Sequence, residues 1–350
     1  MVWENNVRKV VPYVAGEQPK KKEIIKLNTN ECPYPPAPAV AKLSAQMDTN
    51  SFRLYPDQNN ESIVNALAEY YGVKPTQVFA GVGSDDVLSL SFLTFFNSDK
   101  PILFPDVTYS FYDVWADLYT IPYKTVPLLD DWSIDVEGMK QENGGVIFPN
   151  PNAPTGLFTP LDKVEEIIEA NRDVVVIVDE AYIDFGGESA LPLLEKYDNL
   201  LIVQTFSKSR AMAGMRIGFA IGNEKIIKYL NDVKFSFNSY TLNMPSQILG
   251  ALAVKDDAYF KDITGKIIAT REWTKKELTG LGFTFPDSKA NFIFASHKSV
   301  PAKDIYNYLR GQNIFVRFWD KERINNSLRI TIGTDEQMRT LIAALEVFLG

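Results

Sequence analysis

The sequence has 350 residues, 45% of them hydrophobic, and a formal net charge of −8. This length predicts about two domains around a large buried core. An acidic chain without a basic stripe repels nucleic acid, and its apolar runs are shorter than the roughly 18 residues of a membrane span. The first 22 residues lack the apolar centre of a secretion signal, so we expect a cytoplasmic protein that binds neither nucleic acid nor membranes. The lysines at 20–22 form the one basic run and are interpreted as solvated surface.

Short apolar runs alternate with helical patterns from residue 77 to residue 222. The alternation predicts strands at 77–80, 101–104, 145–148, 174–178, 200–203 and 217–221, with helices at 85–96, 110–119 and 161–170. Further on we expect helices at 245–254, 259–281 and 335–348, and strands at 292–294, 314–316 and 328–332. This pattern predicts an α/β fold, in which a large domain with a mostly parallel sheet flanked by helices is joined to a smaller α+β domain.

The domain boundaries follow from this change of pattern. We expect residues 1–35 to form an N-terminal segment that packs on the small domain and the active site. The large, cofactor-binding domain is expected at 36–250 and the small C-terminal domain at 251–350. Prolines cluster between residues 32 and 38, where the chain is expected to cross between domains.

The chain has one cysteine, Cys32, and one histidine, His297. An intrachain disulfide is therefore impossible, and a structural zinc site lacks its roughly four Cys or His ligands. A serine or cysteine triad would need His297 as its base, but His297 follows an apolar run and is interpreted as a strand-end residue near the surface. We expect no metal, and we expect Lys, Tyr, Asp or Glu to carry any general acid–base chemistry.

A lysine stands in a loop of small residues after the strand at 200–203, in the segment TFSKSRAMAGMR at 205–216. An amine such as that of Lys208 can form a Schiff base with an aldehyde, and burial favours this by lowering its pKa. Ser207 and Arg216 are donors suited to a phosphate. Taken alone, the segment also fits an exposed loop lysine with an unrelated arginine.

An aspartate ends the strand at 174–178, in the segment VDEAY at 178–182. A carboxylate in the position of Asp179 can keep a pyridine nitrogen protonated, and a protonated pyridine ring is an effective electron sink. Tyr182 can reach the phenolic oxygen of such a ring. The alternative is a metal-binding or helix-capping aspartate.

Two further loops follow predicted strands. The segment NPNAPTG at 150–156 is rich in turn-forming residues and can hold Asn152 rigidly, so that it donates to the same phenolic oxygen. The segment GVGSD at 81–85 opens a helix, where the backbone N–H groups of Ser84 and Asp85 and the Ser84 hydroxyl suit an anion. Each segment alone also fits an ordinary turn or helix start.

The four segments together, in this order, resemble the fold type I pyridoxal-phosphate aminotransferases. The resemblance implies pyridoxal 5′-phosphate as the cofactor, with Lys208, Asp179 and Tyr182 as catalytic residues. It also implies that Tyr109 stacks on the cofactor ring. Tyr55, in the segment RLYPD at 53–57, would reach the phosphate of the neighbouring subunit's cofactor, which implies a homodimer. The implied cofactor-binding set is completed by Ser84, Asp85, Asn152, Thr205, Ser207 and Arg216.

The N-terminal segments VPYVAGEQP at 11–19 and IKLNTNECPYPP at 25–36 are similar to the histidinol-phosphate subfamily of class II, and the similarity extends to the last helix. It implies that substrate phosphate or carboxylate is bound by Tyr13, Asn30, Arg317 and Arg329. An ion pair with Asp320 is the alternative for Arg317. Cys32 and Ala15 stand where relatives often carry asparagine and proline.

The reaction that this resemblance implies is transfer of the amino group of L-histidinol phosphate to 2-oxoglutarate, giving imidazole-acetol phosphate and L-glutamate in L-histidine biosynthesis. Lys208 would move the proton, and Asp179 would stabilise the charge on the ring. Three alternatives stay open: an aromatic amino-acid aminotransferase, a threonine-phosphate decarboxylase of the same fold, and a non-catalytic module that holds the cofactor.

Overall fold

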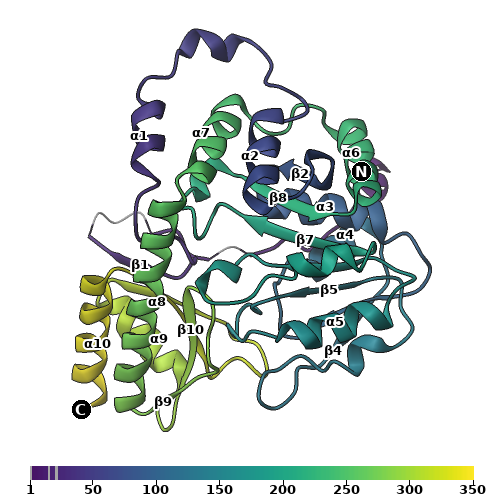
Figure 1. Ribbon diagram of the computed structural model, residues 1–350. Coiled ribbons are helices and arrows are strands. Elements are labelled where there is room, and N and C mark those ends of the chain that lie inside the picture. Colours follow the sequence, from purple (N-terminus) through teal and green to yellow (C-terminus); the bar gives the residue numbers. More distant parts are fainter. Residues whose placement is uncertain (1, 15, 20–22) are drawn as a thin grey trace.

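The computed structural model describes residues 2–14, 16–19 and 23–350, so Ala15 and the lysines at 20–22 lie outside the described residues. The described chain contains a sheet of seven strands and a sheet of five strands. Figure 1 shows the larger sheet surrounded by helices and the smaller one beside the last three helices of the chain. The predicted combination of a large α/β part and a smaller α+β part is confirmed.

The seven-stranded sheet has the order β2-β8-β7-β6-β5-β3-β4. Only β8 runs antiparallel to its neighbours, so the prediction of a mostly parallel sheet is correct. The strands are β2 (Val78–Gly81), β3 (Ile102–Pro105), β4 (Tyr123–Val126), β5 (Val146–Pro149), β6 (Val176–Asp179), β7 (Leu200–Thr205) and β8 (Gly218–Gly222).

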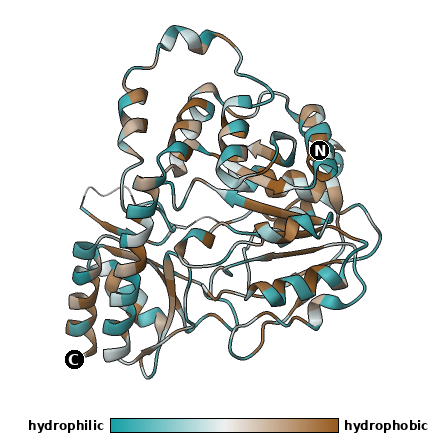
Figure 2. Ribbon diagram, in the orientation of Figure 1, coloured by the Kyte–Doolittle hydropathy of each residue, from teal (hydrophilic) through white to brown (hydrophobic). Residues whose placement is uncertain are grey.

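The central strands are buried on both faces, because alternate side chains enter two different cores. Ile147 and Ile177 pack in the core formed with α3, α4 and α6, whereas Val146 and Val178 pack in the core that includes α5. Figure 2 shows the strands as mainly hydrophobic, with hydrophilic residues concentrated on the helices. The helices around this sheet are α1 (Pro38–Ser44), α2 (Glu61–Tyr71), α3 (Gly83–Phe95), α4 (Tyr112–Tyr119), α5 (Leu161–Ala170), α6 (Glu224–Phe237) and α7 (Met244–Lys255).

The five-stranded sheet has the order β1-β11-β12-β10-β9, so the N-terminal segment supplies one of its edge strands. β1 pairs in parallel with β11, with Ile25 opposite Ile314. This sheet packs with three helices into a separate core. The elements are β1 (Ile25–Leu27), α8 (Asp257–Gly280), β9 (Phe283–Thr284), β10 (Phe292–His297), α9 (Ala302–Gly311), β11 (Ile314–Phe318), β12 (Leu328–Thr331) and α10 (Asp335–Leu349).

The expected domain boundary at 250/251 falls inside α7. Because α7 belongs to a core with α1 and α2, and α8 belongs to the core of the five-stranded sheet, we propose Asp256 as the place where the large domain ends. Asp256 lies between the two helices and caps α8 by accepting a hydrogen bond from the Tyr259 N–H.

His297 ends β10 as expected, but the prediction that it lies near the surface is wrong, since only 8% of the residue is exposed. Its Nδ1 accepts hydrogen bonds from the N–H groups of Ser299 and Val300, at 3.3 and 3.0 Å. Its Nε2 lies 3.0 Å from the carbonyl oxygen of Leu281, and its ring packs edge-on against Phe283. The chain folds back over the imidazole after β10, so both ring nitrogens serve the fold and neither is available as a catalytic base.

Candidate active site

The predicted site segments meet at one edge of the seven-stranded sheet, because the carboxyl ends of parallel strands lie together. β6 ends at Asp179, and the lysine loop begins after Thr205, the last residue of β7. β8 runs the opposite way, with Gly218 opposite Thr205 and Gly81. The residues that precede β8, including Arg216, therefore reach the same edge as the residues that follow the parallel strands.

Asp179 is 4% exposed, and its carboxylate accepts hydrogen bonds from the Tyr112 hydroxyl at 2.9 Å and the Ala181 N–H at 3.2 Å. Burial raises the pKa of Asp179 to about 6, because these two neutral donors do not replace the water that the carboxylate has lost. A cation beside the carboxylate would favour its charged form. Tyr112 was not singled out from the sequence, although it lies in the same TYSFY segment as Tyr109.

Lys208 is half-buried, and its Nζ donates to the carbonyl oxygen of Thr29 at 3.2 Å. The same nitrogen lies 5.8 Å from the centre of the Tyr182 ring. The Tyr182 hydroxyl accepts a hydrogen bond from the Asn30 amide at 3.0 Å, and the Asn30 Oδ1 accepts one from the Thr331 hydroxyl at 2.9 Å. Asn30, expected to bind substrate, therefore uses its side chain to connect Tyr182 with β12, while the Tyr182 O–H proton is left for another acceptor.

The start of α3 and the Arg216 guanidinium pack closely together. Gly83 has a φ of +83°, and a Cβ there would lie 2.5 Å from Nη2 of Arg216. That Nη2 is 3.3 Å from Oδ2 of Asp85, whose other oxygen accepts from the Tyr109 hydroxyl at 2.7 Å. A Cβ on Gly218 would lie 2.3 Å from the backbone nitrogen of Ser84. Glycines thus allow the helix start, the arginine and β8 to converge on one point.

Ser207 and Thr205 are both buried and are linked to each other. The Thr205 hydroxyl lies 3.0 Å from Oγ of Ser207 and accepts from the Ser207 N–H at 3.1 Å. Nη1 of Arg216 lies 3.5 Å from the same Oγ. Ser207 therefore lies between Arg216 and Thr205, and its position is fixed by two hydrogen bonds to the Thr205 hydroxyl.

Asn152 lies close to the predicted site but does not point its donor as expected. Its Nδ2 donates to the carbonyl oxygen of Val107 at 3.1 Å and to Oγ1 of Thr155 at 3.0 Å, while its buried Oδ1 has no partner. Donation to a ring oxygen would require the amide to rotate and release Val107.

A cavity of about 180 Å³ lies at this edge, between the two sheets. Its lining includes Lys208, Tyr182, Tyr109, Tyr13, Asn30, Trp319, Arg317 and Arg329. The Tyr13 ring stacks on Phe111 at 4.1 Å, which fixes the N-terminal segment over α4. An adjoining cleft of about 540 Å³ shares Tyr109, Pro154 and Trp319 with the cavity. The small cavity thus continues into a wider space along the large sheet.

The two predicted substrate arginines face each other across β11 and β12, with Arg317 directly opposite Arg329. Like charges in this position destabilise a sheet, unless a partner of opposite charge lies between them. The Nε of Arg329 is buried without a partner, and burial lowers the pKa of its guanidinium. Trp319 was not singled out from the sequence. The centre of its ring lies 5.1 Å from the guanidinium carbon of Arg317 and 5.2 Å from that of Arg329. Asp320, the alternative partner for Arg317, forms an ion pair with Lys303.

Tyr55 is not among the residues that line the cavity. It is 80% exposed, and its ring stacks on that of Tyr240 at 4.7 Å. Phe52 and Leu54, which are close to Tyr55 in the chain, are also exposed apolar side chains, and so is Phe237, three residues before Tyr240. The predicted role of Tyr55 in a neighbouring subunit stays a prediction.

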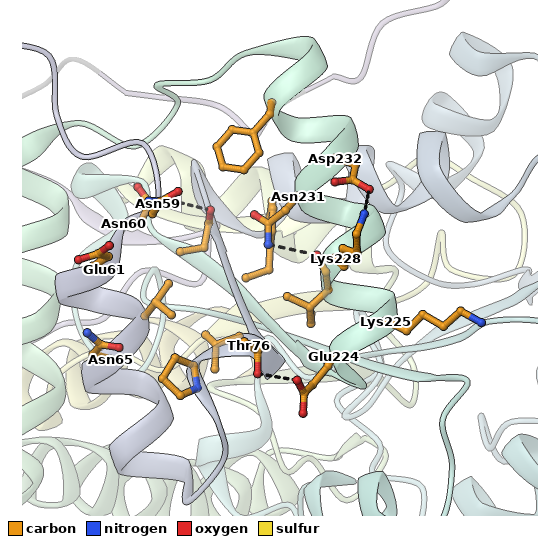
Figure 3. Close-up of a pocket in the computed structure, with 17 residues that line it drawn as sticks. Asn59, Asn60, Glu61, Asn65, Thr76, Glu224, Lys225, Lys228, Asn231 and Asp232 are labelled. Carbon is orange, nitrogen blue, oxygen red and sulfur yellow. Dashed lines mark hydrogen bonds and ion pairs between the residues drawn. The ribbon is translucent and has the colours of Figure 1, made fainter.

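A larger cavity, of about 790 Å³, lies elsewhere, between α2, β2 and α6. Figure 3 shows that some of its polar side chains pair with each other, Glu224 with Thr76 and Lys228 with Asp232, whereas Lys225, Glu61 and Asn65 have no marked partner. None of the predicted site residues lines it. Size alone therefore does not mark the chemical site of this protein.

The described residues also contain no helix long and apolar enough to cross a membrane, and no group of three or more His, Cys, Asp or Glu placed to hold a metal ion.

Comparisons with known proteins agree with this arrangement. The family model for class I and II aminotransferases matches residues 22–345. The histidinol-phosphate aminotransferase of Lactococcus lactis subsp. cremoris strain MG1363 is 52% identical over 349 residues, which cover 100% of this chain and 98% of that protein. The enzyme of the same name from Clostridium botulinum strain Langeland is 52% identical over 348 residues, covering 99% and 98%.

A solved structure gives the same result. The histidinol-phosphate aminotransferase of Sinorhizobium meliloti, crystallised in complex with pyridoxal 5′-phosphate, superposes with a TM-score of 0.88 at 25% identity. The match covers 97% of this chain and 95% of that one. The chain belongs to the class I and II aminotransferases and, within them, to the histidinol-phosphate aminotransferase family.

Proposed function

We propose that this protein transfers the amino group of L-histidinol phosphate to 2-oxoglutarate in L-histidine biosynthesis, with pyridoxal 5′-phosphate as its cofactor. The main observation behind the proposal is that Arg317 and Arg329 stand opposite each other in the small sheet and line the same cavity as Lys208. Paired guanidinium groups suit a phosphate, and the amine suits transamination. The names of the relatives support the same reaction.

The residues present fit pyridoxal 5′-phosphate. The space above Gly83 is filled by the Arg216 guanidinium, at a helix start where backbone N–H groups favour a phosphate. Asp179 is a buried carboxylate whose raised pKa calls for a cation, which a protonated ring nitrogen would provide. The Oδ1 of Asn152 is buried nearby without a partner. When bound, the cofactor supplies a conjugated ring that accepts the electrons of the bond broken at the amino-bearing carbon.

Each protein group has a separate task in this proposal. Asp179 would keep the proton on the ring nitrogen. Lys208 would hold the cofactor through Nζ until the substrate amine takes its place, and the Lys208 amine would then move the proton of the substrate carbon. Tyr182 would donate its O–H to the phenolic oxygen, while Asn30 fixes the position of its hydroxyl. Arg216, Ser207 and Ser84 would bind the cofactor phosphate, and Tyr109 would contact the ring.

Arg329 is expected to decide between a phosphorylated and an unphosphorylated substrate. Lysine at this position keeps the charge but loses the fork of donors, so Arg329→Lys should raise KM for histidinol phosphate by about 10- to 100-fold. The kcat at saturation should change much less. Steady-state kinetics with histidinol phosphate and with L-phenylalanine measure both effects, and an equal rise in the KM for phenylalanine would show that Arg329 binds the substrate carboxylate rather than selecting a phosphate.

The same assay separates the alternatives. An enzyme that turns over phenylalanine more efficiently than histidinol phosphate is an aromatic amino-acid aminotransferase. Release of carbon dioxide from threonine phosphate would identify the decarboxylase. Absence of an absorbance change on adding substrate amine would favour a module that binds the cofactor without catalysis.

We further propose that the enzyme acts as a homodimer in the cytoplasm. The exposed apolar side chains around Tyr55 support an interface there, and the single cysteine fits a reducing compartment.

If Tyr55 completes the partner's site, a hybrid dimer of one Lys208→Ala subunit and one Tyr55→Ala subunit contains one intact site. Hybrids purified through two different tags should then recover about half of the wild-type activity per dimer, although both parents are impaired. Hybrids no more active than the parents would place Tyr55 outside the partner's site.

A further inference from the structure

The turn η5 (Ile183–Phe185) directly follows Tyr182 and contacts the lysine loop. The carboxylate of Asp184 accepts a hydrogen bond from the hydroxyl of Ser209, the residue after Lys208. Ser209 is 2% exposed, so water does not compete for this hydrogen bond. The contact joins the segment that carries Asp179 and Tyr182 to the segment that carries the amine.

The turn side of this contact is fixed by a buried arginine. Arg271 of α8 is 2% exposed, and its Nη1 donates to the carbonyl oxygens of Phe185 and Ala290, at 2.7 and 2.9 Å. Phe185 is the residue after Asp184. The turn is therefore held in place by a helix of the small domain, and Asp184 offers its carboxylate from a fixed position.

The lysine side is fixed by a second buried arginine. Arg210, which follows Ser209, is 7% exposed and donates from Nη1 to the carbonyl oxygen of Ala253 at 3.0 Å. Its guanidinium carbon lies 4.1 Å from the centre of the Phe260 ring and 5.0 Å from that of Tyr70. Burial raises the pKa of Asp184, whereas the Ser209 hydrogen bond and the Arg210 charge lower it. Asp184 therefore interacts with both residues that follow Lys208.

We propose that Asp184 is a positioning residue, which fixes the backbone of Lys208 relative to Asp179 and Tyr182 through its hydrogen bond to Ser209. This inference rests on the proposed function, in which the amine and the Asp179 carboxylate act on opposite ends of one ring. The lysine stem is flexible, so its backbone anchor determines where Nζ can lie. A misplacement of 1 Å can reduce a rate by about 100-fold, and loss of one tether should have a smaller effect.

The test uses the cofactor-loaded protein and the variants Asp184→Ala, Asp184→Asn, Ser209→Ala and the double variant Asp184→Ala/Ser209→Ala. Glu180→Gln is the matched control. Glu180 is a buried acid of the same segment, 2% exposed, and its carboxylate accepts from Gln204, Ser189 and the Ala190 N–H rather than from the lysine loop. The readouts are kcat, KM, the thermal midpoint, and the visible circular dichroism of the lysine-bound cofactor, which reports the orientation of the ring.

Asp184→Ala and Ser209→Ala should each lower kcat by about tenfold and weaken the circular dichroism band, with KM changed less than about twofold. The double variant should lose no more than Asp184→Ala, because both single changes remove the same hydrogen bond. Asp184→Asn should keep most of the kcat, since its amide oxygen can still accept from Ser209. Glu180→Gln should keep the wild-type band even if its thermal midpoint falls.

Wild-type kcat and circular dichroism in Asp184→Ala would overturn the inference, and so would additive losses in the double variant or equal losses in Asp184→Ala and Asp184→Asn. If Asp184→Ala does not fold, Ser209→Ala carries the same test with a smaller change. A wild-type protein without a lysine-bound cofactor band would instead overturn the proposed function. The two failures are therefore distinguishable.

Discussion

Lys208→Ala is expected to reduce transamination by about 10⁴-fold or more, because in the proposed mechanism one amine both holds the cofactor covalently and moves the proton. The variant should still take up pyridoxal 5′-phosphate, since Ser207, Arg216 and the start of α3 are unchanged. Single-turnover kinetics measure the loss of transamination, and the absorbance of the cofactor that stays with the variant after gel filtration measures its uptake.

Lys208→Arg is the matched control for this experiment. It keeps a positive charge near the Thr29 carbonyl oxygen that Lys208 contacts, but it cannot form the covalent link. Both variants should be inactive, and added methylamine should partly restore proton transfer in Lys208→Ala only. A Lys208→Ala enzyme that turns over normally would contradict the proposed chemistry.

Asp179→Asn is expected to lower kcat by about 10²- to 10³-fold, because a neutral amide cannot keep the ring nitrogen protonated. The same change should stabilise the cofactor-free protein at high pH. Burial raises the pKa of Asp179 from 3.8 to about 6, and this difference corresponds to about 3 kcal/mol.

The direction of the pH effect follows from the two pKa values. The carboxyl group binds its proton more tightly in the folded chain than in the unfolded chain, so stability falls as the pH rises from about 4 through about 6 and stays lower above it. Asp179→Asn should therefore match wild type near pH 4 and exceed it by up to about 3 kcal/mol near pH 8.

Urea denaturation of the cofactor-free proteins at several pH values measures this difference. Burial raises the pKa of Glu180 to about 7 and adds a similar trend to both proteins, so only the difference between them reports Asp179. Saturation with pyridoxal 5′-phosphate should reverse the order at pH 8, because the ring cation then pairs with the wild-type carboxylate. If the cofactor-free wild-type protein is as stable as the variant at pH 8, the buried charge of Asp179 does not lower the free energy of unfolding, and the prediction is wrong.

The sequence predicted the elements whose local signals are strong. The continuous apolar run that becomes β6 and the polar residues at its end located Asp179. β4 was missed because three of its four residues are exposed, so its pattern is not that of a buried strand. α6 and α9 were also missed, since each carries only a narrow apolar stripe among charged residues, such as Ile226, Ile227 and Leu230 in α6.

Several of the predicted site residues meet in the structure, but their contacts could not be predicted from the sequence. The Asn30 amide bonds to Tyr182 across 152 positions of the chain, and no local pattern reports such a distant pair. Asn152 stands in the expected loop, yet the carbonyl oxygen of Val107 decides which way its amide points. Trp319 could not be recognised because its role depends on two arginines that a sheet register places together.

The edge position of β1 has a consequence for the order in which this protein can fold during synthesis. Ile25 needs Ile314 as its partner, and a ribosome adding about 5–20 residues per second requires roughly 15 to 60 s to make the intervening ~290 residues. Until Ile314 is made, the segment lacks its partner β11, and by then all seven strands of the large sheet, which end at Gly222, have been synthesised. The small sheet, and with it the Asn30 contacts to Tyr182 and Thr331, is therefore completed only after β12 has been made.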